Sequence, residues 1–309
     1  MRSSLVLVLV VSLAHADELL DVTRSAKLAA GTYTLSGRQT LPKGVRLTLQ
    51  KGVKIVGEDE GAAIDVVGTL ECLGAPGEEV VFQNIWLSLD RPFKSIRLSH
   101  TKMLGKGGVF TTHERQTIGK LFLEDVAFRD KASLWVIFQE GTLTATRVSS
   151  ESSCQIAGTH TNRNFKLDVS DCFAAKGVSG FQGGFRLHNV KDVRLRRIEV
   201  GGIISSFRGC TKLLMEECTL GARSFTMRQD KKGRYAKTKI LRCNFVTPLL
   251  KFHAPAGSRD KVTLTECHFK GDGATPPAEI ATKRTKSENV RVTVKAPSPE
   301  PHALASAGG

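Results

Sequence analysis

Apolar and polar residues alternate along this chain in a unit that recurs about every 24 residues. The unit has apolar residues at its first and third positions and a small apolar residue or Cys at its sixth, as in residues 121–126 and 167–172. Alternation with a period of two is typical of half-buried strands and not of helices. The units begin at residues 47, 70, 96, 121, 143, 167, 193, 213, 238, 262 and 290.

A strand repeat of constant length predicts a solenoid, in which equivalent residues of successive coils stack about 4.8 Å apart. Second apolar segments between the units, such as residues 134–138 and 249–252, predict two or three short strands per coil. We therefore expect an all-β parallel β-helix of about eleven coils. Two inward columns follow from the pattern, one of Ile96, Leu121, Leu143, Leu167, Val193, Leu213, Thr238, Val262 and Val290, the other of Leu98, Leu123, Ala145, Val169, Leu195, Met215, Ile240, Leu264 and Val292.

The fifth position of the unit is an independent test of the alignment between coils, because that alignment was set from the apolar positions alone. Its residues alternate in charge from coil to coil, and opposite charges on adjacent strands attract. We expect an exposed ladder of ion pairs at a corner of the coil that mainly specifies register, since surface pairs stabilise little. This corner column consists of Asp125, Arg147, Asp171, Arg197, Glu217, Arg242 and Glu266.

A leucine-rich repeat is the alternative fold, since its period and its L-x-L pattern are compatible with this unit. It would require an apolar residue three positions before each strand, where this chain has Cys210, Tyr235, Arg259 or Asn164. The intervening segments also lack helical spacing. The parallel β-helix is the better interpretation.

The two ends of the chain differ in composition from the repeat. Residues 1–16 have an apolar run followed by Ala14-His15-Ala16, which predicts a cleaved signal peptide. Residues 17–295 are then one β-helix domain, with a short capping helix expected over residues 17–30. Residues 296–309 are rich in Pro, Ala and Gly and are expected to be disordered. We expect a secreted, periplasmic or extracellular protein without a membrane span.

The formal net charge of +15 is distributed unevenly. Residues 17–90 contain 7 Lys or Arg and 11 Asp or Glu, whereas residues 91–309 contain 37 and 19. A basic body on an exported protein favours an anionic polysaccharide or another cell-envelope component as partner, through attraction that weakens with salt. Nucleic acid is not the partner we expect, and oligomeric state stays open.

The segment 41–55, followed by residues 63–70 and 77–82, resembles the first coils of right-handed β-helix proteins of the pectate-lyase-like superfamily. The resemblance covers residues 31–295 and implies a right-handed coil. It implies no single activity, because that superfamily includes lyases, hydrolases and adhesins. The N-T-D, D-D, G-H-G and R-I-K motifs of its polygalacturonase-like members do not occur in this sequence.

Catalytic and metal-binding patterns give few candidates. The acidic runs fall in turns or in the corner column, and the histidines lack metal-ligand spacing, so we expect neither a metal nor a cofactor. Glu124, Asp168 and Glu216 are each two coils apart on the outward face, too far for a glycosidase pair. The seven cysteines include four at the sixth position, which predicts mostly reduced and buried thiols, although neighbours such as Cys218 and Cys243 could pair.

Basic residues provide the predicted binding site. Arg194 and Arg196 project from one face of a strand, and residues 228–235 form the densest basic cluster. These groups could bind an acidic glycan through charge-assisted hydrogen bonds. Arg196 is the one candidate for the base of a lyase. We expect a non-catalytic binder; a polysaccharide lyase or hydrolase and a structural surface or adhesin module are the alternatives. The predicted anion-binding residues are Arg194, Arg196, Arg228, Lys231, Lys232 and Arg234.

Overall fold

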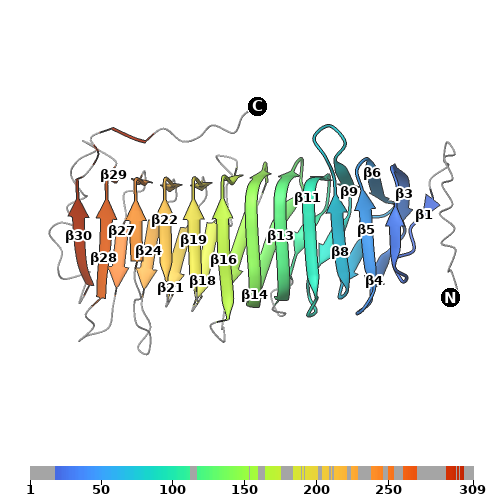
Figure 1. Ribbon diagram of the computed structural model, residues 1–309, viewed down its shortest axis with the longest axis horizontal. Helices are drawn as coiled ribbons and strands as arrows, with labels where there is room; N and C mark the ends of the chain where they lie inside the picture. The colour runs from blue at the N-terminus through green and yellow to red at the C-terminus, as the bar shows by residue number, and fades with distance from the viewer. Residues whose placement is uncertain are drawn as a thin grey trace, which may run out of the picture.

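The computed structural model shows a parallel β-solenoid whose strands stack side by side along the long axis of the molecule (Figure 1). It describes residues 18–111, 117–152, 154–158, 164–174, 184–188, 190, 192–200, 204–208, 210, 212–220, 224–228, 238–245, 250–253, 260–269, 290–296, 298 and 300–302. No helix occurs among these residues, which excludes the leucine-rich repeat with intervening helices over the described chain.

The repeating unit forms the first of three parallel ladders. Leu47, Leu70 and Ile96 are register partners in successive strands, and the series continues through Leu121 and Leu143 as predicted. The strands of this first ladder are β2 (Ala26–Leu28), β5 (Arg46–Gln50), β8 (Thr69–Leu73), the first parts of β11 (Ser95–Leu104) and β13 (Thr117–Phe128), the middle of β14 (Ser133–Ser150), β16 (Phe165–Ser170), β19 (Asp192–Arg196), β22 (Leu213–Glu216), β25 (Thr238–Leu241), β28 (Asp260–Thr265) and β30 (Val290–Lys295).

Two further ladders complete each coil, which confirms the expectation of two or three short strands. The second ladder follows the corner column and contains β1 (Glu18–Leu19), β3 (Gly31–Leu35), β6 (Val53–Gly57), β9 (Val80–Gln83), the last parts of β11, β13 and β14, β17 (Phe173–Ala174), β20 (Glu199–Val200), β23 (Thr219–Leu220), β26 (Asn244–Phe245) and β29 (His268–Phe269). The third contains β4 (Arg38–Leu41), β7 (Ala63–Val66), β10 (Trp86–Ser88), β12 (Gly108–Phe110), the start of β14, β15 (Cys154–Gly158), β18 (Gly184–His188), β21 (Ile204–Arg208), β24 (Ser224–Arg228) and β27 (Leu250–His253).

The chain completes about seven turns, fewer than the eleven coils that the pattern predicts. These turns span residues 18–174, where the description is nearly continuous. Beyond Ala174 the coils are described only in part, although their separate strands keep the register of the three ladders.

The core lies inside the coil and is built from the predicted inward columns. Ile96, Leu121 and Leu143 have no exposed surface, and the second inward column from Leu98 to Leu264 is equally buried. Phenylalanine rings add to this core, with Phe138 stacked on Phe165 at a centroid distance of 4.8 Å. Because each coil buries its apolar faces only against its neighbours, stacking itself creates the core.

One register differs from the prediction at the last strand. Val262 pairs with Val292 and not with Val290, so Val292 belongs to the first inward column and Val294 to the second. The sequence 290–294 alternates Val with polar residues, and a slip of two residues keeps every Val on the same face. The pattern therefore could not distinguish the two registers.

The N-terminal cap also differs from the prediction. Strands β1 and β2 occur within residues 18–30, where we expected a capping helix. Leu20 and Val22 are buried and belong to the hydrophobic core, whereas Leu19 is largely exposed, so only part of the apolar side chains of this segment cover the core. The predicted signal peptide at residues 1–16 lies outside the described residues.

Part of the expected C-terminal tail contacts the solenoid. The N–H of Ser298 donates a hydrogen bond to the carbonyl of Cys267 at 3.0 Å. The Asn244 side chain donates to the His302 carbonyl at 2.8 Å and accepts from the His302 N–H at 2.9 Å. These bonds attach Ser298 and His302 to the solenoid, while residues 297, 299 and 303–309 lie outside the description.

Candidate anion-binding site

The six predicted anion-binding residues do not form one described cluster. Arg194 and Arg196 belong to β19 of the first ladder, whereas Arg228 ends β24 of the third. Lys231, Lys232 and Arg234 lie outside the described residues. The structure thus divides the predicted site between two ladders.

Acidic side chains accompany both arginines of the first ladder. The Nε of Arg194 lies 3.7 Å from Oδ1 of Asp192, and Nη2 of Arg196 donates to Oδ1 of Asp168 at 3.4 Å. Lys212 approaches the other oxygen of Asp192 to 3.8 Å. The positive charge of this pair is therefore partly offset within the protein, which weakens its attraction for an external anion.

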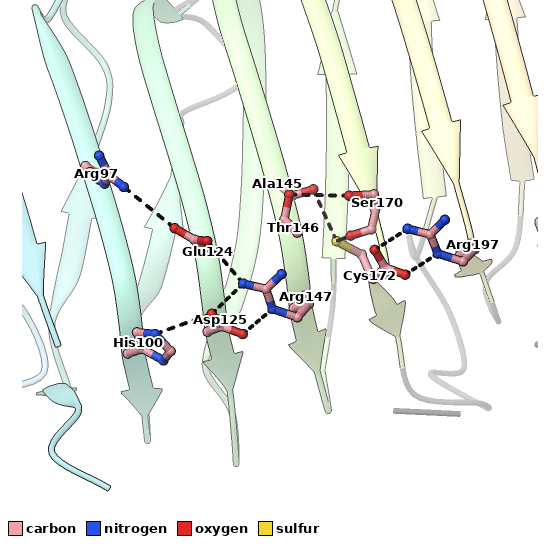
Figure 2. A network of polar contacts seen from close by, with 11 residues as sticks. Arg97, His100, Glu124, Asp125, Ala145, Thr146, Arg147, Ser170, Cys172 and Arg197 are labelled. Atoms are coloured by element: carbon pink, nitrogen blue, oxygen red, sulfur yellow. Dashed lines mark hydrogen bonds and ion pairs between the residues drawn. The ribbon is translucent and has the colours of Figure 1, made fainter. Parts of the chain in front are cut away.

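The outward carboxylates of the same ladder are also paired. Glu124 accepts a hydrogen bond from Arg147 at 3.1 Å and lies 3.7 Å from Arg97 (Figure 2). Glu216 contacts Arg242. Each of these two glutamates thus has an arginine partner. The register also places Glu124 and Asp168 on strands two apart, as the sequence predicts.

The corner column forms discrete pairs and not a continuous ladder of ion pairs. Arg147 binds Asp125 through two hydrogen bonds, and Arg197 binds Asp171 in the same way at 2.6 and 2.8 Å (Figure 2). Arg242 donates to Glu217 at 3.0 Å. Each arginine thus bonds the acid of the coil before it. Hydrogen bonds from Arg147 and Arg197 lower the pKa values of Asp125 and Asp171.

A polar hollow on the third ladder was not found by sequence reasoning. Arg38 donates to both oxygens of Asp65 at 2.6 and 2.9 Å and to Oγ of Ser88 at 3.1 Å. Val66, Asp90 and Arg91 complete the lining. The strand register brings Asp65 and Ser88 together, because they are partners in β7 and β10. The intervals between these residues, close to one coil length, were the signal that could have revealed it.

The hollow is occupied by the ion pair between Arg38 and Asp65. Burial acts to raise the pKa of Asp65, but hydrogen bonds from Arg38 and Ser88 outweigh it and lower that pKa. Asp65 therefore stays ionised at neutral pH. The space between the side chains accommodates about one water molecule, too little for a sugar ring.

Arg228 has basic neighbours on the third ladder. Its register partners are Arg208 in β21 and His253 in β27, and Arg208 pairs in turn with His188 in β18. These four residues thus form one column across consecutive coils. The sequence analysis named only Arg228 because it did not fix the register of this ladder.

Metal clusters and membrane-spanning helices are not found among the described residues. These residues contain no group of three His, Cys, Asp or Glu side chains able to hold a metal ion, and no helix among them has the length and apolar character to span a membrane. No family model, curated protein or solved structure matches this sequence.

Proposed function

We propose that this chain is an exported, non-catalytic β-helix that binds an anionic polysaccharide of the cell envelope on its basic flank. The right-handed sense of the coil and kinship with the pectate-lyase-like superfamily belong to this proposal.

The supporting observation is the separation of charge along the solenoid axis. Since coils stack in sequence order, the described strands of the acidic segment 17–90 lie at one end of the solenoid and those of the basic segment 91–309 make up the rest (Figure 1). An elongated body with 37 basic and 19 acidic residues over its larger part attracts polyanions along its length. This basic excess remains even if every acidic residue of the segment is paired with a basic one.

Heparin affinity chromatography tests the proposal. We expect the exported chain to be retained on heparin at low salt and released by rising NaCl, because exposed charges are screened within about 10 Å at 0.1 M salt. An uncharged glycan resin is the control and should not retain the protein. Passage through heparin at low salt contradicts the proposal.

The alternative functions predict other results for the same purified protein. A lyase would produce unsaturated products that absorb in the ultraviolet during incubation with a panel of uronate polymers, and Arg196→Ala would abolish them. An adhesin or structural module would associate with itself or with cells in a way that salt does not reverse. Either outcome replaces the proposed function.

A further inference from the structure

We propose that the outer face of the third ladder at β10, β12 and β14 binds the sugar rings of an acidic polysaccharide. The rings stack on Trp86, Phe110 and Trp135, which we call the aromatic stripe, and Arg91 binds an acidic group of the same polymer. This inference rests on the proposed function and assigns the subsite that holds the sugar rings.

The aromatic stripe crosses three neighbouring strands. Trp86 begins β10, Phe110 ends β12 and Trp135 lies near the start of β14. Phe110 and Trp135 are register partners, so their strands are adjacent and about 4.8 Å apart. The rings of Trp86 and Phe110 meet edge to face, with centroids 5.2 Å apart and planes at 77°. The chain contains only two tryptophans, and both belong to this stripe.

The burial of neighbouring positions places the stripe on the outer face. The residues beside the three aromatic residues along their strands are buried in the core: Leu87, Val109, Leu134 and Val136. Since successive positions of a strand alternate between faces, the aromatic residues lie on the face opposite to the core. Each of the three is half-buried, which leaves part of its surface accessible to a ligand.

Gly108 allows the contact between the first two rings. It is the register partner of Trp86 in β12 and has no side chain to separate the indole from Phe110. Phe110 lies two positions further along the same strand, on the diagonal that large aromatic side chains can span. The two rings thus cover the face jointly across two coils.

The polar hollow between Arg38 and Asp65 adjoins the stripe. Ser88 lines this hollow and is the register partner of Phe110. Its hydroxyl donates to Oδ2 of Asp90 at 3.2 Å. Carboxylate oxygens, which have several acceptor positions each, therefore lie close to the stripe. The space in the hollow, about one water molecule, suits a single sugar hydroxyl as the donor.

Arg91 provides positive charge beside the same hollow. It lines the hollow, is exposed to solvent and exerts its charge on Asp65. Its guanidinium donates no hydrogen bond to another described residue, so its fork of donors is available to a carboxylate or sulfate group. A sugar ring on the stripe can thus place an acidic substituent at Arg91.

A polysaccharide fits this combination better than single-stranded nucleic acid does. One face of a pyranose ring consists largely of C–H groups, which pack against the negative face of an aromatic ring. Bases also stack on aromatic side chains, but the phosphates beside them would be repelled by Asp65 and Asp90. Sugar hydroxyls instead find acceptors in these carboxylates.

Tryptophan fluorescence tests the subsite without any substitution, because both tryptophans of the chain belong to the stripe. We expect polygalacturonate oligomers to change the emission of the unchanged protein in a saturable way and to protect it from quenching by acrylamide. Maltose oligomers are the control. They should require a much higher concentration, because they have no acidic group for Arg91.

A matched set of aromatic variants tests the stacking surface, with binding measured by calorimetry. Trp135→Ala should weaken binding of polygalacturonate about tenfold, since its ring surface is lost. Trp135→Phe, which keeps an aromatic ring, should lose less than about threefold. Phe122→Ala is the control, because Phe122 is a half-buried outward residue of the first ladder, and it should change affinity less than about twofold.

A second pair of variants tests the charge. Arg91→Gln should weaken binding of polygalacturonate about fivefold, since a charge-assisted contact is lost. Arg24→Gln removes another exposed charge, outside the third ladder, and should leave the affinity almost unchanged. Equal losses for Arg91→Gln and Arg24→Gln overturn the role of Arg91.

The remaining outcomes separate the subsite from the proposed function. Circular dichroism and thermal melting verify that each variant folds. Retention on heparin without any change of tryptophan emission by polygalacturonate overturns the subsite but leaves the proposed function intact. Absence of binding to both heparin and polygalacturonate overturns both. A change of emission at lower concentrations of single-stranded DNA than of polygalacturonate overturns the assignment to polysaccharide.

Discussion

Arg147 binds Asp125 across adjacent strands through Nε–Oδ1 and Nη2–Oδ2 contacts of 2.5 and 2.8 Å, and both residues have left-handed backbone conformations with φ of 53° and 52°. Left-handed φ is uncommon for residues other than glycine and costs about 1–2 kcal/mol. The conformation recurs at every corner from residue 100 onward, where the chain passes from the first ladder to the second. The other residues that adopt it there are His100, Asp171, Arg197, Glu217, Arg242, Glu266 and Ala296.

Main-chain bonds hold these corners in place. The N–H of Arg197 donates to the carbonyl of Glu216 in the next coil at 2.9 Å, and the N–H of Glu217 donates to Leu241 at 3.0 Å. Asp171, Arg242 and Glu266 make the equivalent bond. The backbone thus fixes the turn, and the alternating charges stabilise its side-chain layer.

Reversal of one charge in the corner column should destabilise the solenoid. Arg147→Glu places a third carboxylate beside Glu124 and Asp125, and we expect the free energy of unfolding to fall by about 1 kcal/mol. The double variant Asp125→Lys with Arg147→Glu should recover most of the loss. Thermal melting measures both, and equal melting temperatures for the single and double variants contradict the paired arrangement.

Ala296 offers a test of the backbone cost without an ion pair. Its φ of 43° matches the other corners, so Ala296→Gly should stabilise the last coil by up to about 1 kcal/mol. Amide hydrogen exchange in β30 should become slower. Ala145→Gly is the control, since Ala145 lies within the regular strand β14 and glycine there weakens it. Faster exchange in β30 of the Ala296 variant contradicts the assigned conformation.

Acid should destabilise the corner pairs. Because the pKa values of Asp125 and Asp171 are lowered in the folded state, their contribution to stability is present above the unfolded pKa of about 3.9 and is lost as pH falls through the folded values. We expect melting temperatures to fall below about pH 4. The variant Asp125→Asn with Asp171→Asn should show a flatter profile there; parallel profiles for the two proteins count against these pairs.

Phe165 tests the stacked core. Its ring is fully buried against Phe138, so Phe165→Ala should cost about 3–5 kcal/mol, whereas Phe165→Leu should cost less. Phe122→Ala is the control, because Phe122 occupies an outward position of β13 and is only half-buried. Similar losses of melting temperature for Phe165→Ala and Phe122→Ala show that the core register is wrong.

The buried thiols should resist alkylation. Burial raises the pKa of Cys243, and it raises that of Cys267 to about 11. The thiolate is the reactive form, so iodoacetamide at pH 8 should label these two cysteines only after denaturation. Peptide mass spectrometry identifies the labelled sites, and urea-treated protein is the control. Labelling of either site in the native protein at the rate of an exposed thiol contradicts their burial.

Local features of the sequence determined the strands, the inward columns and the corner column. Strand alternation has a period of two and the coil a period of about 24 residues, so both appear in the order of residues without knowledge of their contacts. Ile96, Leu121 and Leu143 were identified in this way, and each is buried as a register partner of the next.

Only the tertiary structure decided which neighbours interact. It set the two-residue shift that pairs Val262 with Val292. The sequence could not decide this shift, because either register buries the same kind of residue. The tertiary structure directed Arg147 toward Asp125, a choice that alternating charges leave open. It also aligned Arg208 with Arg228 on the third ladder, since loops of variable length hide that register in the sequence. Stacking distance and turn geometry, which depend on the whole coil, determine each of these contacts.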